Sequence, residues 1–378
     1  MNSARAHDGV LPRSVHRTDA HGGNVWRRPG GPSAVVDFSA NINPLGMPPG
    51  VVEAVAGALP EAVHYPDPEY RELRRALSLH LGVEPQHILP GNGATDLIHL
   101  LPRALEARRA VILPPCFGEY RRAAEAAGRE VVSVCGREGE GFLPPLARLE
   151  GVLRGGDLLF LASPNNPTGG LLPAEWLEGA LALSRSRSAR CCLDEAFLDF
   201  SPEGRSLSRA PLAAERGSRL IVLRSFTKVY ALPGLRAGCL VAERETVERL
   251  FQKMPPWTVN HLAEAAVRAA VADGDYLERT WRLIRTEREY LSRALAAMGP
   301  LRVWPSEANF LLLKLEGGAP SAGEVARRLE RLGILIRDCT ATEGLGERFL
   351  RVAVRTRAEN ERLLSSLREA LGPEGGKG

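Results

Sequence analysis

The chain has 378 residues, of which 44% are hydrophobic and 25% are charged, and its formal net charge is +4. These values are ordinary for a globular protein, and arginines scattered along the chain do not predict a nucleic-acid partner. No apolar run is long enough to span a bilayer, so we expect no membrane partner. Residues 1–20 are polar and lack the apolar core of a secretory signal, which predicts a disordered extension and a cytoplasmic location.

The six cysteines show no spacing typical of metal ligands, and most of them lie in apolar, strand-like runs. We therefore expect buried free thiols and no metal site. The cysteines are Cys116, Cys135, Cys191, Cys192, Cys239 and Cys339.

Apolar runs alternate with helical patterns from about residue 65 to residue 259. Several runs are continuously apolar, as is typical of strands covered on both faces. This alternation predicts a large α/β domain with a mainly parallel sheet and helices on both faces. The expected strands are 110–113, 130–134, 158–162, 190–193, 220–223 and 239–242, and the expected helices include 94–105, 118–127 and 173–184.

A second group of elements follows residue 257 and predicts a smaller α+β domain. A helical pattern covers 262–298, short apolar runs lie at 301–303, 308–315, 333–337 and 349–354, and a last helix is expected over 357–371. We expect an N-terminal arm with part of the small domain over 21–64, the large domain over 65–260, a linking helix with the rest of the small domain over 261–371, and a flexible tail over 372–378.

The first motif with possible chemistry is the glycine turn at residues 91–96, which reads Gly-Asn-Gly-Ala-Thr-Asp before a helical pattern. A turn of this kind at a helix N-terminus offers free N–H groups to a phosphate, and Thr95 can add its hydroxyl. An ordinary capped helix start is the alternative.

The second motif, Ser-Pro-Asn-Asn-Pro-Thr-Gly-Gly at residues 163–170, follows an apolar run. Its prolines and glycines indicate a rigid loop at the carboxyl end of a strand, where open α/β sheets bind ligands. An asparagine there can donate a hydrogen bond to a ligand oxygen, although the same composition is typical of plain turns.

The third motif is Asp194-Glu195, directly after the apolar residues 191–193. An acid at the end of a buried strand is unfavourable unless it meets a cation, such as a protonated ring nitrogen of a ligand. The alternative is a helix cap at the end of a strand.

The most informative residue is Lys228, which follows an apolar run at 220–223 and stands among Ser225, Thr227 and, eight positions later, Arg236. A lysine becomes a nucleophile when burial or nearby cations lower its pKa. The hydroxyls and the arginine suit a phosphate dianion. A lysine beside a phosphate cradle is what pyridoxal 5′-phosphate requires. A surface lysine in a loop after a strand is the alternative.

Two arginines complete the set of candidate residues. Arg337 follows the apolar residues 334–336, and Arg351 precedes the apolar residues 352–354. Arginines placed in this way can bind a carboxylate or a phosphate through two parallel hydrogen bonds. Taken singly, each is also compatible with a solvated strand end.

These motifs occur in one order along the chain: glycine turn, asparagine loop, acidic strand end, lysine and arginine. In this the chain resembles the fold-type I pyridoxal-phosphate enzymes, the aspartate aminotransferase superfamily. Within that superfamily it resembles the histidinol-phosphate aminotransferase branch and, most closely, the threonine-phosphate decarboxylases of cobalamin biosynthesis. The similarity covers about residues 21–371 and lies in segments 21–24, 37–46, 224–238, 256–260, 334–337, 350–355 and 359–363.

The resemblance implies a role for each candidate residue. Lys228 would bind the cofactor covalently, Asp194 would pair with its pyridine nitrogen, and Asn166 would donate to its phenolate oxygen. Phe117 would stack on the ring, and Tyr65 would come from the partner subunit of a homodimer with shared active sites. The phosphate would be held by Gly93, Ala94, Thr95, Ser225 and Arg236, and the substrate O-phospho-L-threonine by His21, Gly22, Asn41, Asn166, Arg337 and Arg351.

The chain departs from the superfamily pattern at two points. Phe197 stands where many aminotransferases have a tyrosine whose hydroxyl supports the phenolate, which leaves more of that role to Asn166. Ala94 stands where a glutamate is more usual, which matters little if backbone N–H groups bind the phosphate.

The resemblance favours decarboxylation of O-phospho-L-threonine to (R)-1-amino-2-propanol O-2-phosphate and CO2. A histidinol-phosphate-type aminotransferase that uses 2-oxoglutarate remains the alternative, because a shared fold does not separate the two reactions. A non-catalytic, pyridoxal-phosphate-binding regulator is the third hypothesis, although the sequence shows no DNA-binding domain or linker beside the enzyme-like region.

Overall fold

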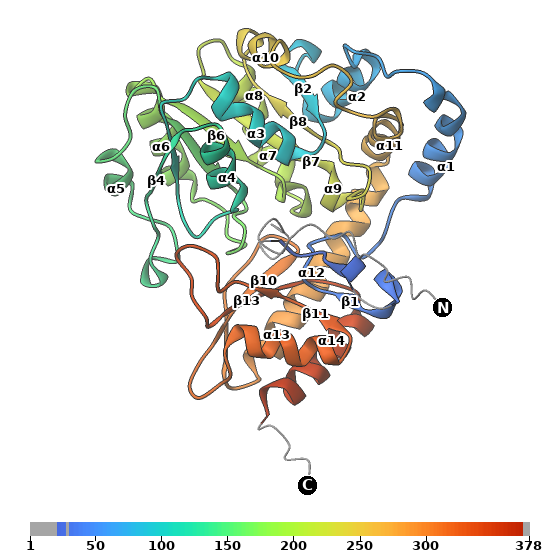
Figure 1. Cartoon of the computed structure of the whole chain (residues 1–378), viewed down its shortest axis with the longest axis vertical. Coiled ribbons are helices and arrows are strands. Elements are labelled where there is room, and N and C mark those ends of the chain that lie inside the picture. Colours follow the sequence, from blue (N-terminus) through green and yellow to red (C-terminus); the bar gives the residue numbers. More distant parts are fainter. Residues whose placement is uncertain (1–20, 28–29, 373–378) are drawn as a thin grey trace, which may run out of the picture.

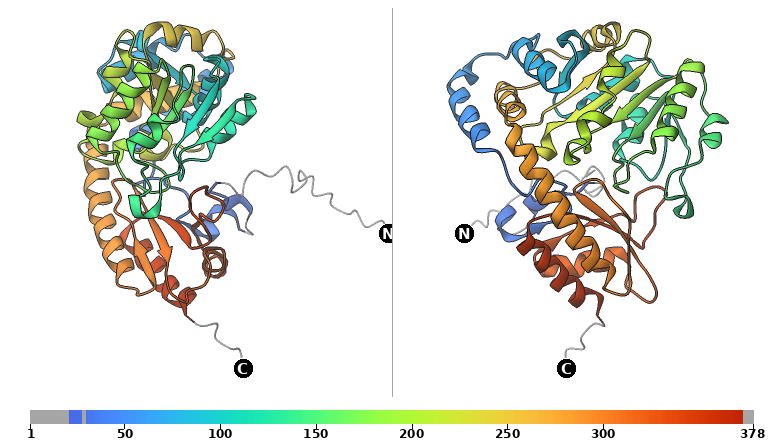
Figure 2. Two further views of the ribbon diagram at one scale, coloured as in Figure 1. Left: turned by 90° about the vertical axis from the view of Figure 1, so that its left-hand side faces the viewer. Right: turned by 180° about the vertical axis from the view of Figure 1, so that it is seen from behind.

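The structure is a computed structural model, and it describes residues 21–27 and 30–372. The predicted extension at 1–20 and the tail beyond Gly372 lie outside these residues. Figure 1 shows a large domain above a smaller one, and Figure 2 shows the long helix α12 (Gly274–Ala296) running from one to the other.

The large domain is built on a seven-stranded sheet in the order β2-β8-β7-β6-β5-β3-β4. Neighbouring strands are parallel except that β8 is antiparallel to both β2 and β7, so the mainly parallel sheet that the sequence predicts is confirmed. The strands are β2 (Ile88–Gly91), β3 (Arg109–Ile112), β4 (Glu130–Ser133), β5 (Leu158–Ala162), β6 (Arg190–Asp194), β7 (Leu220–Ser225) and β8 (Gly238–Val241). Strand β2 was not predicted.

Both faces of this sheet are covered, which explains why its central strands are continuously apolar. Leu158 and Phe160 of β5 face one hydrophobic cluster, whereas Leu159 and Leu161 face the other. Helices α3 (Ala94–Ala104), α4 (Glu119–Ala126) and α10 (Arg244–Phe251) pack on the first face. Helices α2 (Arg71–Leu81), α6 (Ala174–Ser186), α8 (Ala210–Ala214) and α11 (His261–Ala272) contribute to the second cluster. The other short helices are α1 (Pro49–Ala58), α5 (Leu146–Glu150), α7 (Gly204–Leu207) and α9 (Phe226–Val229).

The small domain is built from both ends of the chain, as expected. Its antiparallel sheet has the order β12-β13-β10-β9, and β1 from the N-terminal arm pairs in parallel with β11. Helices α13 and α14 pack on each other beside these strands. The bounds are β1 (Val36–Asp37), β9 (Leu301–Val303), β10 (Phe310–Leu315), β11 (Ile334–Leu335), β12 (Arg337–Asp338), β13 (Phe349–Ala353), α13 (Ala322–Arg331) and α14 (Arg357–Leu371).

Two predicted elements are divided in the structure. The run 333–337 is not one strand, because β11 pairs with β1 whereas β12 pairs with β13. The helical region 262–298 breaks at Asp273, whose carboxylate accepts a hydrogen bond from the Tyr276 N–H at 3.0 Å and caps α12. The Asp273 carboxylate thus caps a new helix within a region that apolar periodicity alone predicts as continuous.

Helix α12 is attached to both domains. The Trp281 indole donates to the backbone oxygen of Asp199 in the large domain at 2.9 Å. Near its middle, Glu287 accepts hydrogen bonds from Arg357 and Asn360 of α14. The position of the domain boundary at residue 260 stays a prediction.

All six cysteines are free thiols. Four are buried and Cys116 is partly buried, but Cys135 is exposed just beyond the end of β4, so the expectation of buried thiols is wrong for that residue. Among the helices in the described part of the chain, none is long and apolar enough to cross a membrane.

Candidate active site

A cavity of about 200 Å³ lies between the large sheet and the small domain. It opens at the carboxyl ends of β5, β6 and β7, where Asn166, Asp194 and Lys228 line it. Arg337 and Arg351 line it from the small domain. This is the position at which parallel sheets bind ligands.

Lys228 lies in the one-turn helix α9, directly after β7. Its Nζ donates to Ser225 Oγ at 3.2 Å. Burial lowers the pKa of Lys228 to about 8; Asp194 opposes this shift, whereas Arg236 and Arg351 add to it. About a tenth of this amine is therefore unprotonated at pH 7, far more than for a lysine of ordinary pKa, which favours its role as a nucleophile.

Lysine is rare in this chain, which contains only Lys228, Lys253, Lys314 and Lys377. Lys253 is exposed, and Lys314 forms an ion pair with Glu138 at 2.7 Å. Of the lysines in the described part of the chain, Lys228 alone lines the cavity.

Asp194 is the last residue of β6 and is buried. Its carboxylate accepts hydrogen bonds from the Tyr120 hydroxyl at 2.7 Å and from the Ala196 N–H at 2.9 Å. Burial raises the pKa of Asp194, and Tyr120, Lys228 and the Ala196 N–H oppose the rise. A buried carboxylate at a cavity suits a cationic ring nitrogen.

The start of α3 forms a cradle that depends on two glycines. Gly93 has a left-handed φ of 79°, and a Cβ there would lie 2.5 Å from Arg236 Nη2. A Cβ on Gly238 would lie 2.7 Å from the Ala94 nitrogen. The glycines thus allow Arg236 and β8 to approach the free N–H groups of the helix, an arrangement that fits a phosphate. Ser225 Oγ and Thr227 Oγ1, which lie 2.9 Å apart, add hydroxyls near the lysine.

Arg351 lies within β13 rather than at a solvated strand end, and it is only 7% exposed. Its Nη1 donates to Asn166 Oδ1 at 2.6 Å and its Nη2 to the backbone oxygen of Ser39 at 2.7 Å. Its Nε is buried and has no partner among the described residues. Burial lowers the pKa of Arg351 to about 10. Arg337 lies directly opposite on β12, so two guanidinium groups border one side of the cavity.

The segment His21-Gly22-Gly23 packs on Ser39, further along the N-terminal arm, and His21 lines the cavity. A Cβ on Gly22 would lie 2.1 Å from the Ser39 backbone oxygen, so only glycine fits there. The Gly23 N–H donates to Ser39 Oγ at 2.8 Å. Asn41 also lines the cavity, and its buried Oδ1 has no partner among the described residues.

Not every predicted site residue lines this cavity. Ala94, Thr95 and Phe117 do, whereas Gly93, Ser225 and Arg236 lie behind them in the cradle. Tyr65 is 78% exposed and stacks on Trp257 with ring centroids 4.4 Å apart, away from the cavity. The individual roles of all these residues stay predictions.

Two buried residues of α4 were missed from the sequence. Tyr120, which holds Asp194, lies in the first turn of α4, and its ring packs edge to face on Phe117, just before the helix, with centroids 5.8 Å apart. Glu119 pairs with His21 at 2.7 Å, His99 at 2.8 Å and Arg122 at 2.9 Å. Burial alone would raise the pKa of Glu119, but the hydrogen bonds from both imidazoles hold it well below its usual range. A helical pattern does not reveal such partners.

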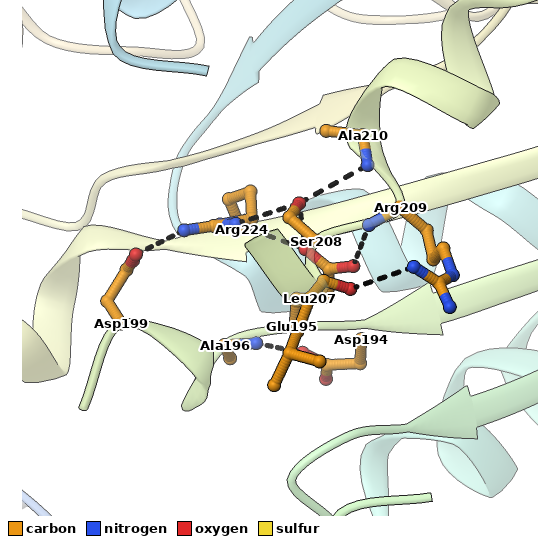
Figure 3. Close-up of polar contacts among 9 residues, drawn as sticks. All are labelled: Asp194, Glu195, Ala196, Asp199, Leu207, Ser208, Arg209, Ala210 and Arg224. Carbon is orange, nitrogen blue, oxygen red and sulfur yellow. Dashed lines mark hydrogen bonds and ion pairs between the residues drawn. The ribbon is translucent and has the colours of Figure 1, made fainter. Parts of the chain in front are cut away.

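Glu195, the neighbour of Asp194, does not line this cavity and lies instead in a network of buried polar contacts (Figure 3). It accepts hydrogen bonds from Ser208 Oγ at 2.6 Å, the Arg209 N–H at 2.7 Å and Arg224 Nη1 at 3.1 Å. Arg224 also pairs with Asp199. This network joins β6 to β7 beneath the site.

A lysine, a buried carboxylate and a phosphate cradle at the carboxyl edge of this sheet define a pyridoxal-phosphate enzyme of fold-type I, with pyridoxal 5′-phosphate as its cofactor. The model of the family "aminotransferase class I and II" matches residues 33–367, and the chain belongs to that family.

Comparison with known proteins identifies relatives with two different activities. Threonine-phosphate decarboxylase of Salmonella typhimurium is 41% identical over 358 residues, which cover 93% of this chain and 96% of the relative. Histidinol-phosphate aminotransferase of Symbiobacterium thermophilum is 37% identical and covers 89% of this chain and 91% of its own length. The crystal structure of histidinol-phosphate aminotransferase from Sinorhizobium meliloti in complex with pyridoxal 5′-phosphate superposes with a TM-score of 0.78 at 25% identity, covering 89% of this chain and 90% of that one.

Proposed function

We propose that the protein decarboxylates O-phospho-L-threonine to (R)-1-amino-2-propanol O-2-phosphate and CO2, with pyridoxal phosphate as cofactor. The observation that carries the proposal is the placement of Arg337 and Arg351 across the cavity from Lys228. The substrate has two anionic groups, a carboxylate and a phosphate, and two guanidinium groups suit them. The similarity to threonine-phosphate decarboxylase supports the same substrate.

The residues proposed to hold the cofactor are those of the cradle and the strand ends. Lys228 binds it covalently, Asp194 holds the proton on its ring nitrogen, Asn166 donates to its phenolate oxygen, and Phe117 stacks on its ring. The α3 N-terminus with Gly93, Ala94 and Thr95, together with Ser225 and Arg236, binds its phosphate. When bound, the cofactor supplies an aromatic ring that takes up the electron pair left on the substrate α-carbon.

The protein's own residues then decide which bond of the α-carbon breaks. Arg351, which is held by Asn166 and Ser39, and Arg337 orient the carboxylate and the phosphate, with His21, Gly22 and Asn41 at the same end of the cavity. Small changes in orientation have large effects on rate, because the reacting bond must be aligned. The substrate amine would displace Lys228 from the cofactor, and the Lys228 amine freed in this way would be the group that protonates the α-carbon once CO2 has left.

A histidinol-phosphate-type aminotransferase is the second candidate, since a relative with that name is 37% identical. It would use the same lysine, aspartate and cradle but would transfer the amino group to 2-oxoglutarate. The two candidates differ in one measurable product. Purified protein loaded with pyridoxal phosphate is incubated with O-phospho-L-threonine, with and without 2-oxoglutarate. We expect CO2 in both cases; amino-group transfer without CO2 would establish the aminotransferase.

The arginine assignments have their own test. Arg337→Lys and Arg351→Lys each remove a planar, two-pronged donor, and the loss of one charge-assisted contact costs about 1.5–3 kcal/mol. We expect CO2 release to fall roughly 10–100-fold while the visible absorbance of the bound cofactor stays unchanged. Arg327→Lys, at an exposed position of α13, is the control. Parental rates in both cavity variants would refute the assignment.

We also propose that the protein is a homodimer in which Tyr65 reaches the cofactor phosphate of the partner subunit. The exposure of Tyr65 and Trp257 on the surface of the monomer supports this. The resemblance of residues 63–67 to the segment that crosses to the neighbouring active site in the family also supports it. Full activity of a strictly monomeric protein at nanomolar concentration would contradict it. The proposed location is the cytoplasm, which is consistent with six unpaired thiols.

A further inference from the structure

The one-turn helix that carries Lys228 ends in backbone carbonyls that its own turn cannot satisfy completely. Helix α9 spans only Phe226–Val229, and the last carbonyls of any helix lack partners within the helix. The Lys228 carbonyl accepts from the Ala231 N–H at 3.3 Å, a long contact. The position of Lys228 therefore depends on what else binds the backbone carbonyls of Lys228 and Val229, the last two residues of the helix.

Asn43 binds both of them from a position far away in the sequence. Its backbone N–H donates to the Lys228 carbonyl at 3.0 Å. Its side-chain Nδ2 donates to the Val229 carbonyl at 2.7 Å and to Thr280 Oγ1 at 2.8 Å. Asn43 is 2% exposed, and Thr280, in the first third of α12, is fully buried. No solvent competes with these bonds.

The orientation of the Asn43 amide is fixed by its partners. Its Oδ1 accepts from the Leu45 N–H at 3.1 Å, and both side-chain hydrogens are used. A flipped amide would place its oxygen against the Val229 carbonyl and its NH2 against the Leu45 N–H. The Thr280 hydroxyl donates in turn to the Tyr276 carbonyl at 2.9 Å, so it receives the Asn43 hydrogen. Donor and acceptor are therefore fixed in every hydrogen bond from Asn43 through Thr280 to Tyr276.

The same short segment also holds the far side of the cavity. The Ser39 carbonyl accepts from Arg351, and the Asn41 carbonyl accepts from Asn309 Nδ2 at 3.0 Å. Residues 39–43 therefore contact both the arginine at one end of the cavity and the lysine turn at the other. Five residues of the arm thus connect the arginine to the lysine turn.

We propose that Asn43 is a positioning residue that fixes the Lys228 turn relative to Arg351, with Thr280 of α12 as its support. The inference rests on the proposed function in one respect, that Lys228 is the amine that binds pyridoxal phosphate. It adds that the reactivity of this amine depends on the arm and on α12, and not only on β7. Without the Asn43 side chain, the Val229 carbonyl loses its donor and the turn that carries Nζ relaxes.

The test compares Asn43→Ala with Asn360→Ala. Asn360 is an equally buried asparagine that also makes two side-chain donor bonds, to Glu287 and to the Arg355 carbonyl, but it lies in the small domain away from the lysine. Two quantities are measured on each folded protein: the rate at which pyridoxal phosphate attaches to Lys228 in the apoprotein, trapped with borohydride and mapped by mass spectrometry, and kcat with KM for O-phosphothreonine. Thermal melting reports the structural cost.

We expect both variants to melt at lower temperature, and Asn43→Ala alone to slow the attachment about tenfold and to lower kcat more than it raises KM. Equal attachment rates and equal kcat in the two variants would overturn the inference. If Asn43→Ala does not fold, Thr280→Val decides, because it keeps the volume and removes the Asn43–Thr280 bond together with the Thr280–Tyr276 bond. An attachment about threefold slower supports the inference, and the parental rate overturns it.

The proposed function and the positioning role of Asn43 are contradicted by different results. If the label in the parent protein is found on Lys253 or Lys314, the proposed function is wrong. If the parent is labelled at Lys228 and Asn43→Ala reacts at the parental rate, only the positioning role is wrong.

Discussion

Asp194 and Glu195 are consecutive acids at the end of one buried strand, but they have different surroundings and different roles. Burial raises the pKa of both. Glu195 is surrounded by donors of its own chain, including Arg224 (Figure 3), whereas Asp194 has Tyr120 and a backbone N–H and otherwise borders the cavity. The comparison teaches that a buried, perturbed acid does not by itself identify an active site; an acid whose remaining partner must come from a ligand does.

The largest expected effect is that of Asp194→Asn on turnover. The variant keeps the shape of the side chain and can still receive the Tyr120 hydrogen bond, but it loses the charge that holds a proton on the cofactor ring. Loss of one pre-organised electrostatic contact of this kind costs about 10²–10³-fold in kcat. Melting temperature should stay near the parental value. More than a tenth of the parental kcat in this variant would break the distinction between the two acids.

Glu195→Gln should show the opposite pattern. Removal of one partner from a buried ion pair costs about 3–5 kcal/mol of unfolding free energy, because Arg224 keeps an incompletely compensated charge. The folded fraction should retain the parental kcat. Urea unfolding measures the loss, and Glu178→Gln, which removes an exposed partner of Arg209, should cost below about 1 kcal/mol. A catalytic defect without instability in Glu195→Gln would contradict the comparison.

Tyr120→Phe tests the partner of Asp194 alone. The hydroxyl donates to the carboxylate and thereby lowers the pKa of Asp194, so its removal raises that pKa further. A smaller fraction of Asp194 is then ionised on the acid side, and the acid limb of the pH–rate profile should move to higher pH. We expect kcat at neutral pH to fall about tenfold, the equivalent of one hydrogen bond to a charged group. An unshifted acid limb would show that another group controls it.

The smallest effect concerns the pH at which Lys228 reacts. Its pKa is lowered to about 8, so the rate of pyridoxal-phosphate attachment to the apoprotein should rise with pH and level off above about pH 8. Because Asp194 raises the pKa of Lys228, Asp194→Asn should move this midpoint to lower pH, whereas Glu195→Gln should leave it in place. A midpoint near 10.5, the ordinary lysine value, would show that the amine is solvated in the apoprotein.

The sequence predicts those features that depend on local patterns. Strands such as β5 and β9 appear as predicted, since unbroken apolar runs between turns indicate them directly. The lysine, the aspartate and the two arginines are brought to one cavity because each stands beside such a strand. Strand β2 was missed because it contains Pro90 and Gly91, residues that are uncommon in strands.

Partners that come from distant segments could not be predicted in the same way. Asn43 meets Val229 and Thr280 across 186 and 237 residues of chain, and no local pattern records such a meeting. Glu119 looks like an ordinary helix residue until His21 and His99 are seen beside it. The sequence thus predicts which side chains can take part in chemistry, whereas the tertiary structure shows which other residues hold those side chains in place.

The scarcity of lysine has a practical consequence for the cofactor. A free aldehyde condenses with accessible amines, whereas guanidinium groups stay protonated and do not compete for it. This chain carries most of its 49 basic residues as arginine and keeps only four side-chain amines, one of which is engaged with Glu138. Among the described residues its surface therefore offers carbonyl reagents few side-chain amines, chiefly Lys253, so that reduction followed by mapping can separate the Lys228 label from background.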